Sequence, residues 1–130
     1  MSEALHTGPL TLAQMAEAVL RTKDGREKTA LSHRFAEMWR QSRAGGTPIE
    51  IGTAHPPLQP ARPDKPEQRD PRDVPRRKPG SPEGRIAILH AIAHIELNAV
   101  DLHWDIVARF THVPFPIGFY DDWVKAADEE

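Results

Sequence analysis

Residues 81–110 read SPEGRIAILHAIAHIELNAVDLHWDIVARF, and this stretch decides the fold. Ser81 can cap a helix, Pro82 suits the first helical position, and Glu83 is favoured at the positive end of the helix dipole. After Gly84 the stretch contains no proline or glycine. The pattern predicts one helix of about thirty residues, roughly 40 Å long. We therefore expect an all-α fold.

Glu96 stands in the middle of the apolar side of this predicted helix. On a helical projection, six apolar residues lie within about 60° of Glu96: Leu89, Ile92, Ala93, Val100, Val107 and Phe110. A carboxylate enclosed by apolar groups is costly unless something compensates its charge. We expect a structural ion pair with another helix, a metal ion, or partial exposure. Arg85 and His103 share the face, but both lie too far along the helix to pair with Glu96 directly.

A last helix is predicted from about Ile117 to Glu130, after a break at residues 111–116 that two prolines enforce. It carries no stop signal, so we expect the chain to end inside a truncated helix. Glu130 falls on the same face as Phe119, Trp123, Ala126 and Ala127. Carboxylates on the apolar faces of consecutive antiparallel helices can converge on one ion, as in bundle-core iron and manganese sites. Glu96 and Glu130 are therefore the candidate metal ligands.

His90 and His94 offer a weaker alternative. They are four residues apart, so they share one strip of the helix, and Asp101 lies on nearly the same strip. Two histidines and a carboxylate are typical of a facial iron triad. However, Asp101 lies roughly 10 Å beyond His94 along the axis. We favour hydrogen bonds from the two histidines to the hairpin or to the proline-rich segment.

Residues 1–46 predict an N-terminal helical hairpin. Thr11 and Gln14 form a capping box for the first helix, and Asp24-Gly25 is typical of a turn. The second helix is expected from about Arg26 to Arg43, and Ala44-Gly45-Gly46 ends it. The apolar faces are Leu12, Met15, Ala16, Val19 and Leu20 in the first helix, and Leu31, Phe35, Met38 and Trp39 in the second.

Residues 47–80 hold most of the 13 prolines and form a proline-rich extended linker. Two interpretations remain open. The linker is either free, or pinned along a helical surface by its few apolar residues, Ile49, Ile51, Leu58 and Val74. The expected division is therefore a hairpin at 1–46, a linker at 47–80, and the first half of a bundle at 81–130.

The composition excludes several kinds of function. A net charge of −2 gives no general attraction to nucleic acid or to anionic membranes, and acidic residues surround the basic cluster Arg76-Arg77-Lys78. The chain has no cysteine, which excludes disulfides and thiolate metal sites. Its first residues lack the basic start and apolar run that we expect of a signal peptide, and no apolar run is long enough to span a membrane. Neither a phosphate-binding loop nor a nucleophile elbow is present. We expect a cytoplasmic protein.

The block Gly84–Leu97, continued by Ala99–Leu102, resembles the DUF455 family of ferritin-like proteins, and so does Phe119-Tyr120-Asp121-Asp122-Trp123. The approach Val74-Pro75-Arg76-Arg77 and the N-terminal hairpin are similar to the same family. The resemblance implies a four-helix bundle with a carboxylate-bridged dinuclear site, in which iron is expected and manganese is the alternative. Glu96 would be the first ligand, and Glu130 the glutamate of a Glu-x-x-His motif.

This chain departs from the implied pattern, because the matching histidine would lie three residues past Glu130 and a second helix pair would be needed. Two hypotheses follow. In the first, the chain is the N-terminal half of a di-iron oxidoreductase, completed by a second copy or by a separate C-terminal half. Oxygen activation or iron oxidation would then occur between the chains. In the second, the chain is a non-enzymatic helical scaffold that dimerises or binds a partner without metal chemistry.

Overall fold

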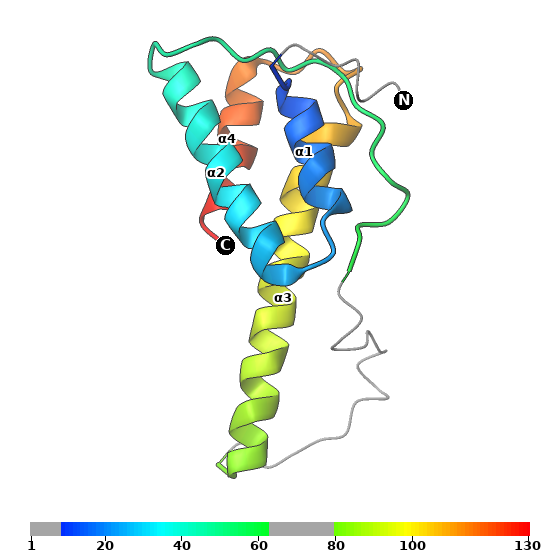
Figure 1. The fold of residues 1–130 in the computed structure, drawn as a ribbon, viewed down its shortest axis with the longest axis vertical. Helices are drawn as coiled ribbons and strands as arrows, with labels where there is room; N and C mark the ends of the chain where they lie inside the picture. The colour runs from blue at the N-terminus through cyan, green and yellow to red at the C-terminus, as the bar shows by residue number, and fades with distance from the viewer. Residues whose placement is uncertain (1–8, 63–79) are drawn as a thin grey trace.

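The computed structural model describes residues 9–62 and 80–130. These residues form four helices and no strand: α1 (Leu12–Arg21), α2 (Gly25–Arg43), α3 (Pro82–Arg109) and α4 (Ile117–Asp128). The prediction of an all-α fold is confirmed. Helices α1, α2 and α4 gather around the second half of α3, while the first half of α3 extends alone beyond them (Figure 1).

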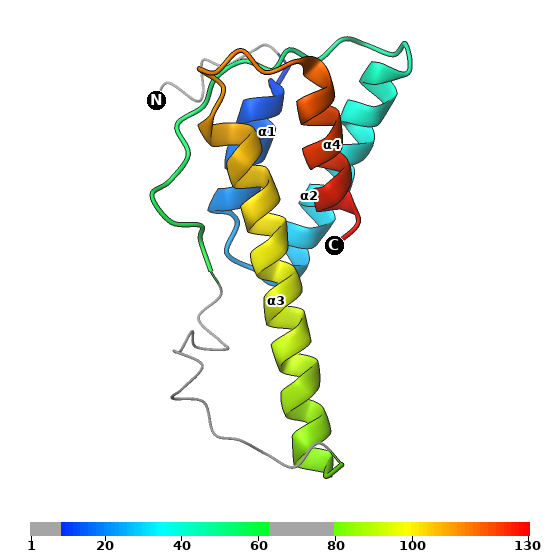
Figure 2. The ribbon, with the colours of Figure 1, turned by 180° about the vertical axis from the view of Figure 1, so that it is seen from behind.

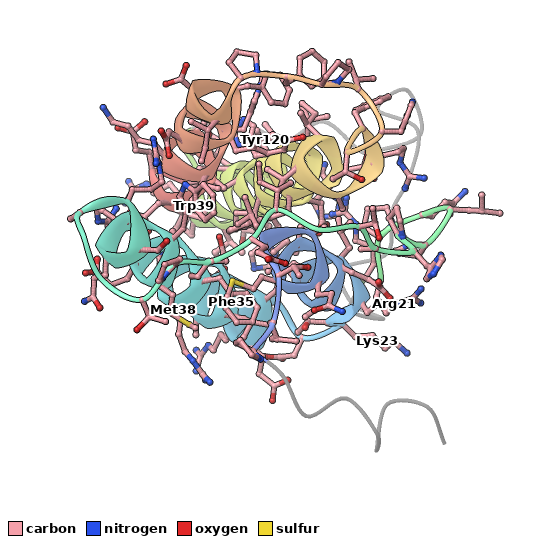
Figure 3. All side chains as sticks on the ribbon, turned by 90° about the horizontal axis from the view of Figure 1, so that it is seen from above. Arg21, Lys23, Phe35, Met38, Trp39 and Tyr120 are labelled. Atoms are coloured by element: carbon pink, nitrogen blue, oxygen red, sulfur yellow. The ribbon has the colours of Figure 1, made fainter. Side chains whose placement is uncertain are left out.

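One hydrophobic core joins all four helices. α3 packs against α1 and α4, and α2 packs against α4. Viewed from above, Trp39 and Tyr120 point between the helices, whereas Met38 lies on the outer side of α2 and is 40% exposed (Figure 3). The prediction that Met38 belongs to the buried face is therefore wrong. The largest members of the core are Leu12, Met15, Val19, Leu20, Phe35, Trp39, Val100, Trp104, Val107, Tyr120 and Val124.

The helix ends follow the local signals closely. Thr11 and Gln14 form the expected capping box, and the Ser81 hydroxyl accepts a hydrogen bond from the Gly84 amide. Two details differ from the prediction. Asp24 is the cap of α2, so Gly25 is already helical, and α4 ends at Asp128 instead of continuing to Glu130. After Asp128, the amides of Glu129 and Glu130 donate to the carbonyls of Lys125 and Ala127, which closes the end of α4.

Residues 47–62 run along α1 and cap both of its ends; we call this segment the strap. The amides of Leu12 and Ala13 donate to the carbonyls of Glu50 and Ile51, at 2.8 and 2.9 Å. At the other end the Ala61 amide donates to the Leu20 carbonyl at 2.7 Å. These are groups that a helix cannot pair internally. The described part of the linker is therefore pinned.

Basic side chains bind three further carbonyls of the strap. Proline has no amide proton but keeps its carbonyl, so a proline-rich segment needs donors from elsewhere. Arg21 donates to the His55 carbonyl, Arg109 to that of Pro57, and Lys28 to that of Ala61. Ile49 and Ile51 pack on the core as expected, whereas Leu58 is 97% exposed. Val74 and the basic cluster at residues 76–78 lie outside the described residues.

Candidate functional site

The first half of α3, residues 82–96, stands clear of the bundle, and we call it the free half of α3. Seen from behind, no other drawn helix lies beside it (Figure 2). Five large apolar side chains on it are between 43% and 65% exposed: Ile86, Ile88, Leu89, Ile92 and Ile95. By contrast, Val100, Trp104 and Val107 in the second half are buried. The second half of α3 is thus packed against other helices, whereas no helix of the described residues packs along the first half.

A hollow of about 1110 Å³ lies where the free half of α3 leaves the bundle. The start of α2 forms one wall, with Asp24, Arg26 and His33 at its border. The other wall is α3, which contributes His90, His94 and Glu96, and Glu130 borders the same space. The structure therefore brings all four sequence-predicted site residues to one hollow.

Glu96 is exposed in the single chain, which agrees with the alternative of partial exposure, and no ion pair joins it to another helix among the described residues. The helical projection correctly placed Glu96 among apolar residues, but it could not tell how far the neighbouring helices reach. The start of α2 lies beside Leu97, and the burial of large α3 side chains begins only at Val100. Glu130 is also exposed and lies outside α4. A metal role for the two carboxylates remains a prediction.

His90 is exposed and His94 is half-buried on the wall of the hollow. Within residues 9–62 and 80–130 no hydrogen bond reaches either imidazole, so the expected bonds to the hairpin are not formed. Asp101 faces away from them toward Lys28, at the buried end of the helix. The structure thus separates the two histidines from the carboxylate that completed the alternative triad.

The residues around the hollow do not by themselves match a dinuclear site. Across the described part of the chain, no three or more histidine, aspartate or glutamate side chains are grouped so that they could hold a metal ion. A carboxylate-bridged site requires four carboxylates and two histidines that converge between helices. Any such site would need further ligands from outside the described residues.

A buried ion cluster lies at the centre of the bundle, and sequence reasoning missed it. Lys28 of α2 is 0% exposed, and its Nζ donates to Asp101 Oδ1 at 2.5 Å. Arg62 of the strap approaches the other carboxylate oxygen at 3.2 Å, as an ion pair without a directed hydrogen bond. Burial lowers the pKa of Lys28 and raises the pKa of Asp101, although the contact between them opposes both shifts. The cluster ties α2, α3 and the strap together.

The position of α4 depends on two aspartates that bind α2. Asp121 accepts a hydrogen bond from the Trp39 indole at 2.8 Å and pairs with Arg43 at 2.9 Å. Asp128 pairs with His33 at 2.7 Å and with Arg40 at 3.2 Å. These contacts fix the end of α4 beside the hollow. They also give Asp121 a structural role that sequence reasoning missed.

None of the helices in the described residues combines the length and apolar character that crossing a membrane requires.

Comparison with known proteins identifies relatives but no activity. The sequence profile of a family described as "Protein of unknown function (DUF455)" matches residues 21–130. An uncharacterized protein of Haemophilus influenzae is 43% identical over 73 aligned residues, which cover 52% of this chain and 25% of that protein. The aligned part of the chain thus spans only about a quarter of the length of this curated relative. No solved structure matches the chain.

Proposed function

Because the chain belongs to the DUF455 family, whose function is unknown, we propose a function from its own surface: it is a helical docking module. In this proposal the free half of α3 packs against helices of another polypeptide, as one half of a ferritin-like bundle. The same proposal places the protein in the cytoplasm, because a chain without cysteine is compatible with a reducing compartment.

The observation that carries this proposal is the exposed apolar length of α3. Isolated apolar side chains are common on protein surfaces, but a continuous apolar stretch usually marks an interaction site. Here the five side chains from Ile86 to Ile95 occupy consecutive turns of a helix that the bundle already holds rigidly at its other end. A preformed helix docks with a smaller loss of conformational freedom than a segment that must fold on binding.

The chemistry of the surface favours helices as the partner. Its apolar residues recur at the spacing by which one helix packs into the grooves of another. The hollow at its base is bordered by Arg26, His33 and Glu96, which offers polar contacts at the rim of an apolar interface. Nucleic acid is disfavoured because the chain carries a net charge of −2.

Site-specific photo-crosslinking in the cells that make this protein tests the proposal. A photoreactive amino acid at Leu89 should form adducts with a helical segment of one defined polypeptide, identified by its crosslinked peptides. The same amino acid at Arg34, which is exposed on α2, is the matched control. An Ile92→Asp change should remove the Leu89 adduct. If Leu89 gives no more adduct than Arg34, the docking function is wrong.

A second candidate is favoured by one observation: Glu96, Glu130, His90 and His94 border the same hollow. In this candidate the chain contributes Glu96 and Glu130 to a carboxylate-bridged iron or manganese site that another polypeptide completes. When bound, the metal would supply oxygen activation or iron oxidation. The chain alone does not group enough ligands for such a site, so we expect it to be inactive alone.

Metal analysis distinguishes this second candidate. The chain purified from iron-supplemented cells, together with whatever copurifies, should contain iron, and a Glu96→Ala change should reduce the iron content. Asp122→Ala is the matched control, because Asp122 is an exposed carboxylate that does not border the hollow. Equal iron in the unchanged protein and the Glu96→Ala variant would remove Glu96 from the site.

A further inference from the structure

The geometry points to a second copy of this chain as the occupant of the free half of α3. In this arrangement the two free halves pack antiparallel about a twofold axis near residues 90 and 91, and each Arg85 faces the Glu96 of the other copy. The inference rests on the proposed docking function and names its partner.

Arg85 and Glu96 are the charges that stand on the apolar stripe of the free half. On the helical projection they lie within about 20° of each other, on the same side as Leu89 and Ile92. Both are exposed, and neither has an ion-pair partner among the residues that the structure describes. Eleven residues separate them (96 − 85), or about 16 Å along the axis, so they cannot pair within one chain.

An antiparallel pairing of two copies about a twofold axis brings Arg85 of one copy beside Glu96 of the other. Arg85 and Glu96 are equally distant from a midpoint between residues 90 and 91, so the twofold axis places each beside the other in the second copy. The same axis brings Leu89 of one copy beside Ile92 of the other. Two ion pairs then flank an apolar centre, and the pairing is self-complementary.

The spacing of these four positions supports a helix pair. The stripe at residues 85, 89, 92 and 96 follows the alternating intervals of four and three that place knobs into holes between two helices. In antiparallel pairs an apolar centre with opposite charges at both ends also fixes the register. A parallel pairing would set like charges side by side, which is unfavourable.

The shape of the molecule leaves room for this pairing. The free half of α3 projects beyond α1, α2 and α4 in both views (Figures 1 and 2). Two copies that overlap only along residues 82–96 therefore keep their bundles at opposite ends. In this interface Glu96 would be buried, and Arg85 of the other copy would supply the counter-charge that a buried carboxylate requires.

Charge-swap mixing tests the inference by sedimentation and light scattering on the full chain. We expect the unchanged chain to dimerise, and Arg85→Glu or Glu96→Arg to weaken self-association on the order of tenfold or more, because each places two like-charge pairs in the interface. The Arg85→Glu/Glu96→Arg double variant should dimerise again. Mixing the two single variants should give a heterodimer, since one copy then presents only acids and the other only bases. Arg34→Glu and Glu50→Arg, which are exposed elsewhere, should change nothing.

Each outcome decides between the proposals. Restored pairing in the mixture and in the double variant supports the second copy with this register. If single variants dimerise as well as the unchanged chain, or the mixture stays monomeric, the inference is wrong. A monomeric unchanged chain whose Leu89 crosslinks to another polypeptide would overturn the second copy and keep the docking function. A monomeric chain without any Leu89 adduct would overturn both.

Discussion

Lys28 and Asp101 are the two charges that the bundle encloses most completely. Lys28 also donates to the Ala61 carbonyl at 2.9 Å, so one ammonium group satisfies both a carboxylate and the strap. Moving two charges out of water is costly, and the pair is tolerable because each compensates the other. The pair contributes to the fold by linking α2, α3 and the strap at one point.

Lys28→Met should therefore destabilise the chain strongly, by about 3–5 kcal/mol, because it leaves the Asp101 carboxylate buried with only Arg62 beside it. The Lys28→Met/Asp101→Leu double variant should recover much of this loss, since no unpaired charge remains. Urea unfolding followed by tryptophan fluorescence measures both. A double variant less stable than Lys28→Met would contradict this explanation.

Asp128 gives the pairing of α4 with α2 a pH dependence. Burial raises the pKa of Asp128, but the hydrogen bonds from His33 and Arg40 outweigh it and leave the pKa below its usual value. Glu37, the other acid beside Arg40, faces the same group. The stabilisation is therefore complete above the ordinary aspartate pKa and is lost as the pH falls through the lowered value.

We expect this term to be at most about 1 kcal/mol, because the pair lies near the surface. Unfolding of the unchanged chain and of Asp128→Asn should be compared between about pH 6, which lies above the reference aspartate pKa, and about pH 3, which lies below it. The stability difference between them should shrink on acidification. A difference that stays constant or grows would show that Asp128 acts otherwise.

The helical face on which each candidate site residue lies was predictable from the sequence, but the burial of these residues was not. The period of α3 and α4 placed Glu96 and Glu130 on facing sides, and both border one hollow. Whether helices cover that hollow depends on packing, which the projection of one helix does not contain. The Lys28–Asp101 pair was not predictable, because it joins residues 73 positions apart whose charges look solvated in sequence.

The strap and α1 stabilise each other through groups that neither could pair alone. The first amides and the last carbonyl groups of a ten-residue helix form a large share of its backbone polar groups. The strap supplies partners at both ends of α1, and α1 in turn buries Ile49 and Ile51 against the core. A short helix that is marginal in isolation becomes fixed by this contact.

Gly52 makes this contact possible and provides its test. It has a φ of +65°, and an added Cβ would lie 2.5 Å from Thr11 Cγ2. Gly52→Ala should destabilise the chain by about 1–2 kcal/mol from the backbone conformation alone, with the clash adding to it. The helical circular dichroism of α1 should decrease with it. Gly45→Ala is a useful comparison, because Gly45 also has a positive φ but meets no atom within 4 Å. Equal losses in the two variants would exclude a role for the Thr11 contact.

The ends of the helices were largely predictable, because caps are local. Thr11, Ser81 and the glycines after Arg43 acted as their sequence neighbours indicated. The strap was not, because its hydrogen bonds join residues 50 and 12, or 61 and 20, and follow from tertiary packing. Proline content alone could not distinguish a free linker from one held by basic side chains.

The molecule as a whole is a small bundle with one long helix that continues past it. A chain of this size has little core to spare, so leaving five large apolar side chains exposed is unfavourable unless another polypeptide covers them. The buried ion cluster and the strap hold the second half of α3 in place. The free half is therefore presented as a stiff helix whose apolar stripe carries one charge near each end, Arg85 and Glu96.

The central claim is that the first half of α3 is a docking surface for helices of another polypeptide. Amide hydrogen exchange along α3, measured by mass spectrometry on the full chain, tests this claim most directly. In dilute solution, amides of residues 85–95 should exchange much faster than those of residues 100–108, and the difference should disappear when the chain assembles with its partner. Equal, slow exchange of both halves in a chain shown to be a lone monomer would contradict the account.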